Sequence, residues 1–108
     1  MVNKLYQKGR NLEYDVIDRL RELGYYTMRS AGSHTIIDVL GWLQGYRLAI
    51  QCKVGSSAFN KDDQEELIRA ALELEALPVL VSRKNRKTTW QTVTREGMLD
   101  YTLRGKSK

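Results

Sequence analysis

The stretch TIIDVLGWLQGYRLAIQCKV, residues 35–54, holds two strand-like segments on either side of Gln44 and Gly45. A two-residue loop of this kind is typical of a tight β-hairpin, and it pairs residues whose numbers sum to 89. A four-residue loop centred on the same point gives the same sum. In this register Asp38 lies directly opposite Gln51. The stretch therefore predicts an antiparallel hairpin with these two polar residues as cross-strand neighbours.

Side-chain alternation gives the predicted hairpin two different faces. The first face is apolar and carries Ile37, Val39, Leu43, Tyr46, Leu48, Ile50 and Cys52. The second face carries Arg47, Ala49, Gln51 and Lys53 together with Asp38. We interpret the first face as core and the second as a polar site.

The polar face has the composition of a divalent-cation site. Directly opposed residues have Cβ atoms about 5 Å apart, so the Asp38 carboxylate and the Gln51 amide oxygen can converge on one ion. Mg²⁺ prefers such hard oxygen ligands with phosphate and water, and the Lys53 ammonium can orient the water or neutralise developing charge. Aspartate is a poor strand residue, which favours a functional role. The alternative, a solvated face with a loose Asp38–Lys53 ion pair, stays open.

The spacing of apolar residues predicts two long helices outside the hairpin. The first covers about 3–23 and ends at Gly24, and the second covers about 63–76 with Asn60 or Asp62 as its N-cap and Pro78 after its end. In the first helix Glu13 lies at i, i+4 and i+7 with Ile17 and Leu20, so it can face the sheet as a further acid. Pairing of an exposed Glu13 with Arg10 is the alternative.

Three more strands are predicted from β-branched and aromatic runs, at 25–32, 79–83 and 88–93, the last two joined by the basic turn KNRK at 84–87. A short helix is expected over 95–103. The resulting order is α-β-β-β-α-β-β-α. We expect a single α/β domain over 1–108, with 103–108 as a frayed basic tail.

Composition narrows the class of protein. The chain has 108 residues, of which 42% are hydrophobic and 29% charged, and no apolar run reaches the roughly 18 residues of a membrane span. Lysine and arginine outnumber the acids by 18 to 13, which suits a polyanionic partner. One cysteine and one histidine exclude a structural zinc site. The expected compartment is intracellular, because no apolar segment follows the charged N-terminus.

These residues resemble a known family. Glu in the first helix, Asp on one strand and Gln-x-Lys on the next resemble the PD-(D/E)xK nucleases. The segments QKGRNLEYDVIDRLRELGYYTMRSAGSHTIIDV, LAIQCKV and LPVLVSR resemble the archaeal Holliday junction resolvases. The resemblance implies a restriction-endonuclease-like α/β fold, with a central mixed β-sheet flanked by helices. It also implies a homodimeric, Mg²⁺-dependent endonuclease, with Mn²⁺ as a substitute, that resolves four-way DNA junctions by metal-activated water.

The resemblance assigns roles to particular residues. It makes Glu13, Asp38 and Gln51 the metal ligands and Lys53 the catalytic lysine, with Ser33 supporting the site. The expected DNA-contacting residues are basic or lie in the loop before Asp38: Lys8, Arg10, Arg29, His34, Lys84, Arg86 and Lys87.

Two departures from the family pattern leave alternatives open. Tyr14 stands where the family usually has arginine, and Gln51 stands where it has glutamate. Glutamine keeps a carbonyl oxygen but lacks charge, so metal affinity is expected to suffer first. The alternatives are a nicking or flap endonuclease of the same superfamily and a catalytically degenerate DNA-binding module.

Overall fold

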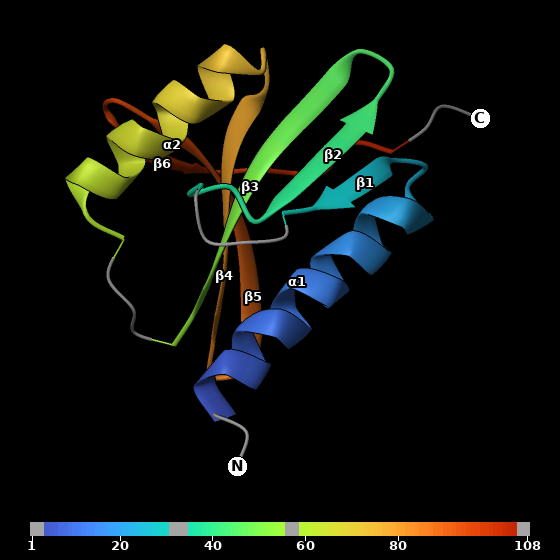
Figure 1. Ribbon diagram of the computed structural model, residues 1–108, viewed down its shortest axis with the longest axis vertical. Helices are drawn as coiled ribbons and strands as arrows, with labels where there is room; N and C mark the ends of the chain where they lie inside the picture. The colour runs from blue at the N-terminus through green and yellow to red at the C-terminus, as the bar shows by residue number, and fades with distance from the viewer. Residues whose placement is uncertain (1–3, 31–34, 56–58, 106–108) are drawn as a thin grey trace.

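The computed structural model describes residues 4–30, 35–55 and 59–105, and the side chains from residue 7 onward within these ranges (Figure 1). Its elements follow one another along the chain as α1 (Lys4–Glu22), β1 (Tyr26–Arg29), β2 (Val39–Leu43), β3 (Tyr46–Val54), α2 (Lys61–Glu73), β4 (Leu77–Lys84), β5 (Lys87–Thr94) and β6 (Gly97–Asp100). All six strands form one sheet in chain order. Only β3 and β4 run parallel, with α2 as the crossover between them. The α/β class with a mixed sheet is confirmed.

The predicted helix over 95–103 is wrong, because β6 occupies the middle of that segment. Thr94 pairs with Gly97 across a tight turn, and the Thr94 hydroxyl donates to the Gly97 carbonyl at 2.6 Å. Gly97 has a φ of +139°, which a residue with a side chain rarely adopts. A glycine that reverses the chain here makes residues 97–100 the last strand of the sheet.

The predicted hairpin register is confirmed over the whole of β2. Leu43 pairs with Tyr46, and the ladder continues to Val39 opposite Ile50, so every pair sums to 89. Gly45 has a φ of +87° in the turn. The Trp42 and Arg47 side chains are cross-strand partners and stack, with the guanidinium 5.8 Å from the ring centre.

Both faces of the sheet are core, which corrects the expectation of one apolar and one polar face. The α1 face buries Leu12, Val16, Ile17, Leu20, Tyr25, Val39, Leu48, Ile50, Val79 and Val81. The α2 face buries Ile37, Ala49, Leu67, Ala71, Leu80 and Val93. A parallel β3–β4 connection places its helix over the second face, so that face cannot remain a solvated polar surface. The predicted face of Ile37 is also wrong: it is buried on the α2 face and not with Val39 and Ile50, because the chain is irregular at Asp38.

The second helix differs from its prediction at both ends. Asn60 is the N-cap and forms a reciprocal capping box with Asp63, which starts the helix at Lys61. The helix ends at Glu73, because Glu75 adopts a φ of +53° and turns the chain toward β4. Pro78 therefore lies within β4 and does not end the helix, and Leu74, just past the end of the helix, is 43% exposed.

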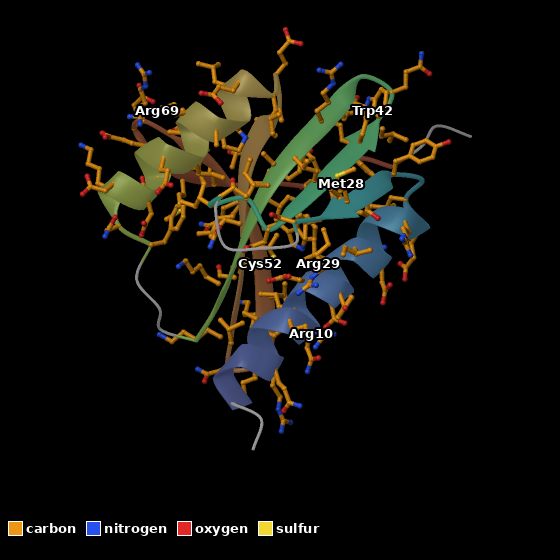
Figure 2. All side chains as sticks on the ribbon, in the orientation of Figure 1. Arg10, Met28, Arg29, Trp42, Cys52 and Arg69 are labelled. Atoms are coloured by element: carbon orange, nitrogen blue, oxygen red, sulfur yellow. The ribbon has the colours of Figure 1, made fainter. Side chains whose placement is uncertain are left out.

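The two helices cover different parts of the sheet. Helix α1 packs on β1, β2 and β3, whereas α2 packs on β3, β4 and β5. On the α2 side Leu40 of β2 still packs against the α2 cluster, but Tyr26 and Met28 of β1 and Trp42 of β2 are exposed. Figure 2 labels Met28 and Trp42 on these two strands, apart from Arg69 on α2. In the described part of the chain, neither helix is long and apolar enough to span a membrane.

Candidate active site

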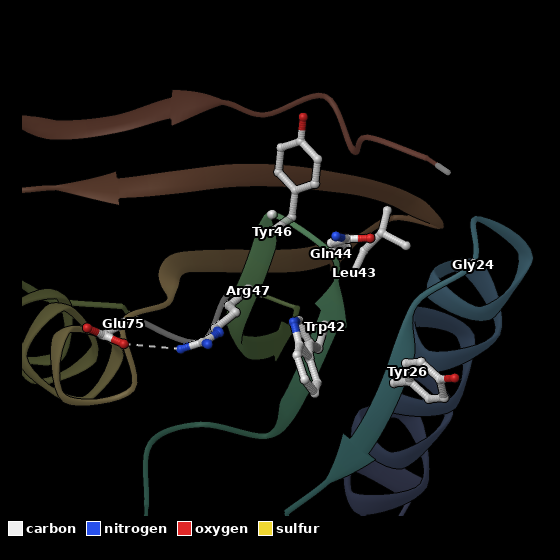
Figure 3. Close-up of a pocket in the computed structure, with 9 residues that line it drawn as sticks. Gly24, Tyr26, Trp42, Leu43, Gln44, Tyr46, Arg47 and Glu75 are labelled. Atoms are coloured by element: carbon white, nitrogen blue, oxygen red, sulfur yellow. Dashed lines mark hydrogen bonds and ion pairs between the residues drawn. The ribbon is translucent and has the colours of Figure 1, made fainter. Parts of the chain in front are cut away.

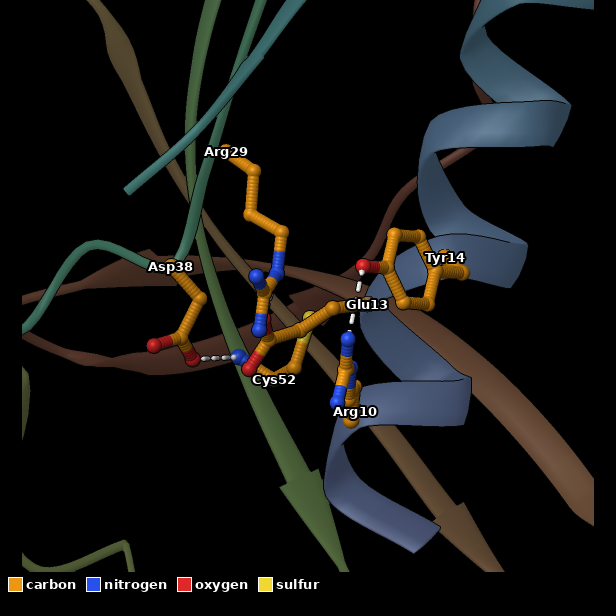
Figure 4. Close-up of polar contacts among 6 residues, drawn as sticks. All are labelled: Arg10, Glu13, Tyr14, Arg29, Asp38 and Cys52. Carbon is orange, nitrogen blue, oxygen red and sulfur yellow. Dashed lines mark hydrogen bonds and ion pairs between the residues drawn. The ribbon is translucent and has the colours of Figure 1, made fainter. Parts of the chain in front are cut away.

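Asp38 immediately precedes β2. Beyond this point β3 extends to Val54 and is no longer paired with β2. The Asp38 backbone N–H donates to the Ile50 carbonyl at 2.8 Å, and the Asp38 carbonyl accepts from the Ser30 N–H at 2.8 Å. Its carboxylate Oδ2 accepts from the Cys52 N–H at 2.8 Å (Figure 4). Asp38 thus contacts both neighbours of Gln51, although regular pairing stops one residue earlier, at Val39. The predicted pairing of Asp38 directly opposite Gln51 is therefore not formed, and contacts with Ile50 and Cys52 replace it. The same bend turns Ile37 to the α2 face.

The surroundings of Asp38 disfavour its charged form. Burial raises the pKa of Asp38 from its ordinary value of 3.8 to about 6. The hydrogen bond from Cys52 lowers this pKa, the nearby Glu13 carboxylate raises it, and the positive charges of Lys53 and Arg29 lower it. The Asp38 carboxylate therefore interacts electrostatically with both Glu13 of α1 and Lys53 of β3.

Glu13 reaches the same region from α1. Its Oε1 accepts from the Arg29 Nε at 2.8 Å, and the Glu13 and Arg29 side chains are 19% and 32% exposed. The helix therefore directs Glu13 toward β1 and Asp38, as its position beside the buried stripe predicts. The ion pair holds Arg29, a predicted DNA contact, against this acid.

Tyr14, the residue that departs from the family pattern, lies between two guanidinium groups. Arg10 and Arg29 lie 5.6 Å and 5.2 Å from the centre of its ring, and Arg10 donates to its hydroxyl at 3.5 Å. That hydrogen bond and the charges of both arginines lower the pKa of Tyr14. An exposed aromatic ring thus aligns two cations beside Glu13, which its residue type alone did not predict.

Gln51 and Lys53 follow one another on the second face of β3, opposite Leu80 and Ser82 of β4. The Gln51 Oε1 is buried and accepts no hydrogen bond from any described residue. A buried acceptor without a donor is costly, and a cation satisfies it.

The residues present fit a hard divalent cation. Two carboxylates, Glu13 and Asp38, and the unpartnered Gln51 amide oxygen are the oxygen ligands that Mg²⁺ uses. Within the described ranges no three His, Cys, Asp or Glu side chains form a metal cluster. An amide such as Gln51 is not one of these residue types. A bound cation would relieve the charge repulsion between these two partly buried acids.

Cys52 contributes its backbone and not its thiol. It packs against the α1 core cluster, and burial raises the pKa of its thiol well above the ordinary range. Its predicted place on the apolar face of the hairpin agrees with this environment.

The predicted DNA-contacting residues fall into separate groups. Arg10 and Arg29 adjoin the acids, whereas Lys8, Lys84 and Arg86 line a cavity at the far end of β3. Lys87 lines a different hollow, with Ser82 and Thr89. Ser33 and His34 lie outside the described residues. Sequence reasoning missed Arg83, which also lines the cavity. The signal was its alternation with the buried Val79 and Val81, which places it on the α1 face.

A mixed sheet between two helices, with acids and a lysine at the open edge of a central strand, defines a restriction-endonuclease-like nuclease. A family model described as archaeal Holliday junction resolvase (Hjc) matches residues 4–106. The chain belongs to this family and is an endonuclease that acts on DNA.

A solved structure supports the fold independently. The Holliday junction resolvase Hjc from Archaeoglobus fulgidus, an archaeal hyperthermophile, matches with a TM-score of 0.67 at 21% identity. The match covers 86% of this chain and 84% of that chain. No curated protein sequence matches the chain.

Proposed function

We propose that the protein resolves four-way DNA junctions inside the cell, as a homodimer that requires Mg²⁺. The observation that carries the proposal is the unpartnered Gln51 Oε1, whose residue lies between the two residues of β3 that Asp38 contacts. Asp38, with a raised pKa, contacts the strand on both sides of Gln51, and Glu13 comes close enough to affect it. Family membership supplies the substrate class, and these residues supply the chemistry.

Glu13, Asp38 and Gln51 are the proposed cation ligands. A divalent cation polarises the scissile phosphate and lowers the pKa of the attacking water. Cys52 fixes the Asp38 carboxylate through its N–H, and Arg29 fixes Glu13. Lys53 neutralises charge that develops on the phosphate.

Arg10 and Arg29 are proposed to contact the phosphates nearest the cut. Their guanidinium groups lie on Tyr14, so their charges are oriented before DNA binds. Phosphate contacts position a nucleic acid without reading its sequence, and base-independent binding is expected. The four-way shape of the DNA would then determine selectivity.

The exposed apolar side chains of β1 and β2 support the homodimer. Tyr26, Met28 and Trp42 are 79%, 66% and 56% exposed, and they share one face because Tyr26 pairs with Trp42. Figure 3 shows a hollow beside them at the β2–β3 turn, with a volume of about 870 Å³, bordered by the Arg47–Glu75 ion pair. Adjacent exposed apolar side chains of this size are typical of a protein interface. A two-fold dimer through this face covers them and provides two sites for paired cuts.

The test is cleavage of a synthetic four-way junction, with nicked, flap and duplex DNA as comparison substrates, in Mg²⁺ and in EDTA. We expect paired cuts of the junction in Mg²⁺ alone, and none by Asp38→Asn. Preferred cleavage of flaps or nicked duplex would favour another nuclease of the superfamily. Junction binding without cleavage in Mg²⁺ or Mn²⁺ would favour a catalytically degenerate DNA-binding module, the alternative that the neutral Gln51 suggests.

A further inference from the structure

A basic cavity lies on the α1 face, at the end of β3, apart from the two acids. Its volume is about 620 Å³, and its described lining consists of Lys8, Asn11, Val54, Gly55, Arg83, Lys84, Asn85 and Arg86. Four of these eight residues are basic, and none is acidic. The charges come from α1, from the end of β4 and from the β4–β5 turn, so the fold brings together cations that are far apart in the sequence.

The wall of the cavity is fixed by Arg83. Its Nη1 donates to Asp15 at 2.8 Å and its Nε donates to the Thr88 hydroxyl at 2.9 Å. Its carbonyl accepts from the Gly55 N–H at 2.8 Å, which ties the end of β3 to β4. By contrast, Lys8, Lys84 and Arg86 are exposed and make no ion pair within the described ranges.

The turn that presents Arg86 is strained. Lys84 pairs with Lys87, and the two residues between them, Asn85 and Arg86, have φ values of +52° and +65°. Such a turn is most stable with Asn-Gly, because glycine adopts a positive φ without a steric cost. Arg86 thus occupies a position where glycine would make the turn more stable. Strain of this kind is found where a side chain has a function.

The cavity adjoins the proposed catalytic residues through two elements. Gly55 directly follows β3, two residues and about 7 Å beyond Lys53, and Asn11 precedes Glu13 by two residues on α1. DNA with one phosphate at Lys53 and Asp38 therefore has other phosphates of the same arm within reach of the cavity.

We propose that this cavity binds a backbone phosphate of a junction arm, distinct from the scissile phosphate, with Arg86 and Lys8 as its principal contacts. The inference rests on the proposed function and adds a second anchoring point to it. Lys87 belongs to the same turn but lines only a neighbouring hollow, which shares Lys84 and Asn85 with the cavity, so it is not one of the principal contacts.

The test compares charge-removing variants in junction binding by fluorescence anisotropy, in EDTA, over a range of salt concentrations. Arg86→Gly is expected to raise the melting temperature, because the turn relaxes, and yet to weaken junction binding on the order of 5- to 10-fold. It should also lower the slope of log K against log[salt] by about one. Arg86→Lys keeps the charge and should retain most of the affinity. Lys8→Ala should weaken binding in the same direction as Arg86→Gly.

Two matched controls remove the same charge elsewhere. Arg95→Ala changes the β5–β6 turn, and Arg69→Ala changes α2; both are expected to alter the salt slope much less. If Arg86→Gly binds no more weakly than these two variants while the wild type cleaves junctions, the phosphate site is refuted and the proposed function stands. If the wild type neither binds nor cleaves junctions, both are refuted.

Discussion

The carboxylate of Asp38 accepts a hydrogen bond from the backbone N–H of Cys52, at a point where a regular strand would offer a carbonyl. The side chain thereby replaces the end of β2 in the sheet. An acid is held at the open edge of β3, partly buried, with a pKa raised to about 6 mainly by burial. A charged Asp38 in this position destabilises the metal-free protein, and a bound cation would offset that destabilisation.

The first prediction concerns pH and stability in EDTA. A carboxyl whose folded pKa exceeds its unfolded value of 3.8 binds its proton more tightly in the native state, so stability falls as pH rises from about 4 to 6. Asp38→Asn keeps an acceptor for Cys52 and removes the charge. We expect it to stabilise the metal-free protein at pH 7.5 by about 1 kcal/mol, a value reduced for solvent screening.

The measurement is the melting temperature of wild type and Asp38→Asn between pH 4 and 8. The two curves should converge near pH 4 and separate above pH 6. Parallel curves across the whole range would show that Asp38 titrates normally, against the raised pKa.

The hairpin could be predicted in detail, but the surroundings of its acid could not. Gln44 and Gly45 determine the loop and therefore every pair from Leu43–Tyr46 to Val39–Ile50. Periodicity assumes that a strand stays regular, and Asp38 breaks that regularity through a hydrogen bond of its own side chain. The chain consequently turns Ile37 to the other face, which no pattern of alternation anticipates.

Other differences also arise from long-range contacts. The pattern of residues 95–103 predicts a helix that includes Gly97. The sequence does not reveal that Gly97 adopts a φ of +139° in the turn to β6. The basic cavity unites α1 with the β4–β5 turn, and only the folded sheet brings Lys8 and Arg86 to one place. The residue types at the site were predictable, whereas their partners, such as Arg29 for Glu13, depended on the folded chain.

The second prediction concerns Tyr14. Tyr14→Phe keeps the ring between Arg10 and Arg29 and loses only the 3.5 Å hydrogen bond, so cleavage should remain close to wild type. Tyr14→Ala removes the stacking surface and should lower junction cleavage on the order of 5-fold, mainly through the Michaelis constant, because the arginines lose orientation and keep their charge. Steady-state kinetics with both variants make the comparison.

An equal loss in both Tyr14 variants would assign the effect to the hydroxyl. Unchanged kinetics in Tyr14→Ala would show that other contacts of the two arginines are sufficient to orient them.

The third prediction concerns the exposed apolar side chains of β1 and β2. Trp42→Glu places a charge among Tyr26 and Met28 and should convert a dimer to a monomer, as measured by light scattering during size-exclusion chromatography. The monomer should nick junctions and should no longer make paired cuts.

Leu99→Glu is the matched control, because Leu99 is 64% exposed on β6 at the other edge of the sheet. It should remain dimeric. A dimer that survives Trp42→Glu would place the interface elsewhere, and a monomeric wild type would refute the dimer itself.

The last prediction concerns Gln51, the amide in place of a family acid. If its buried Oε1 is a cation ligand, Gln51→Glu should require less Mg²⁺ for half-maximal cleavage, since a carboxylate holds a hard cation better than an amide. The same change adds a third acid near Asp38 and Glu13, so the metal-free variant should melt lower than wild type and gain more stability when Mg²⁺ is added. Gln51→Ala should bind junctions and cleave them on the order of 100-fold more slowly. Cleavage rates and melting temperatures over one Mg²⁺ titration, with wild type and both variants, provide two separate readouts. If Gln51→Ala matches wild type in cleavage and in Mg²⁺-dependent melting while Asp38→Asn is inactive, Gln51 is only a strand residue, and Glu13 and Asp38 hold the cation without it.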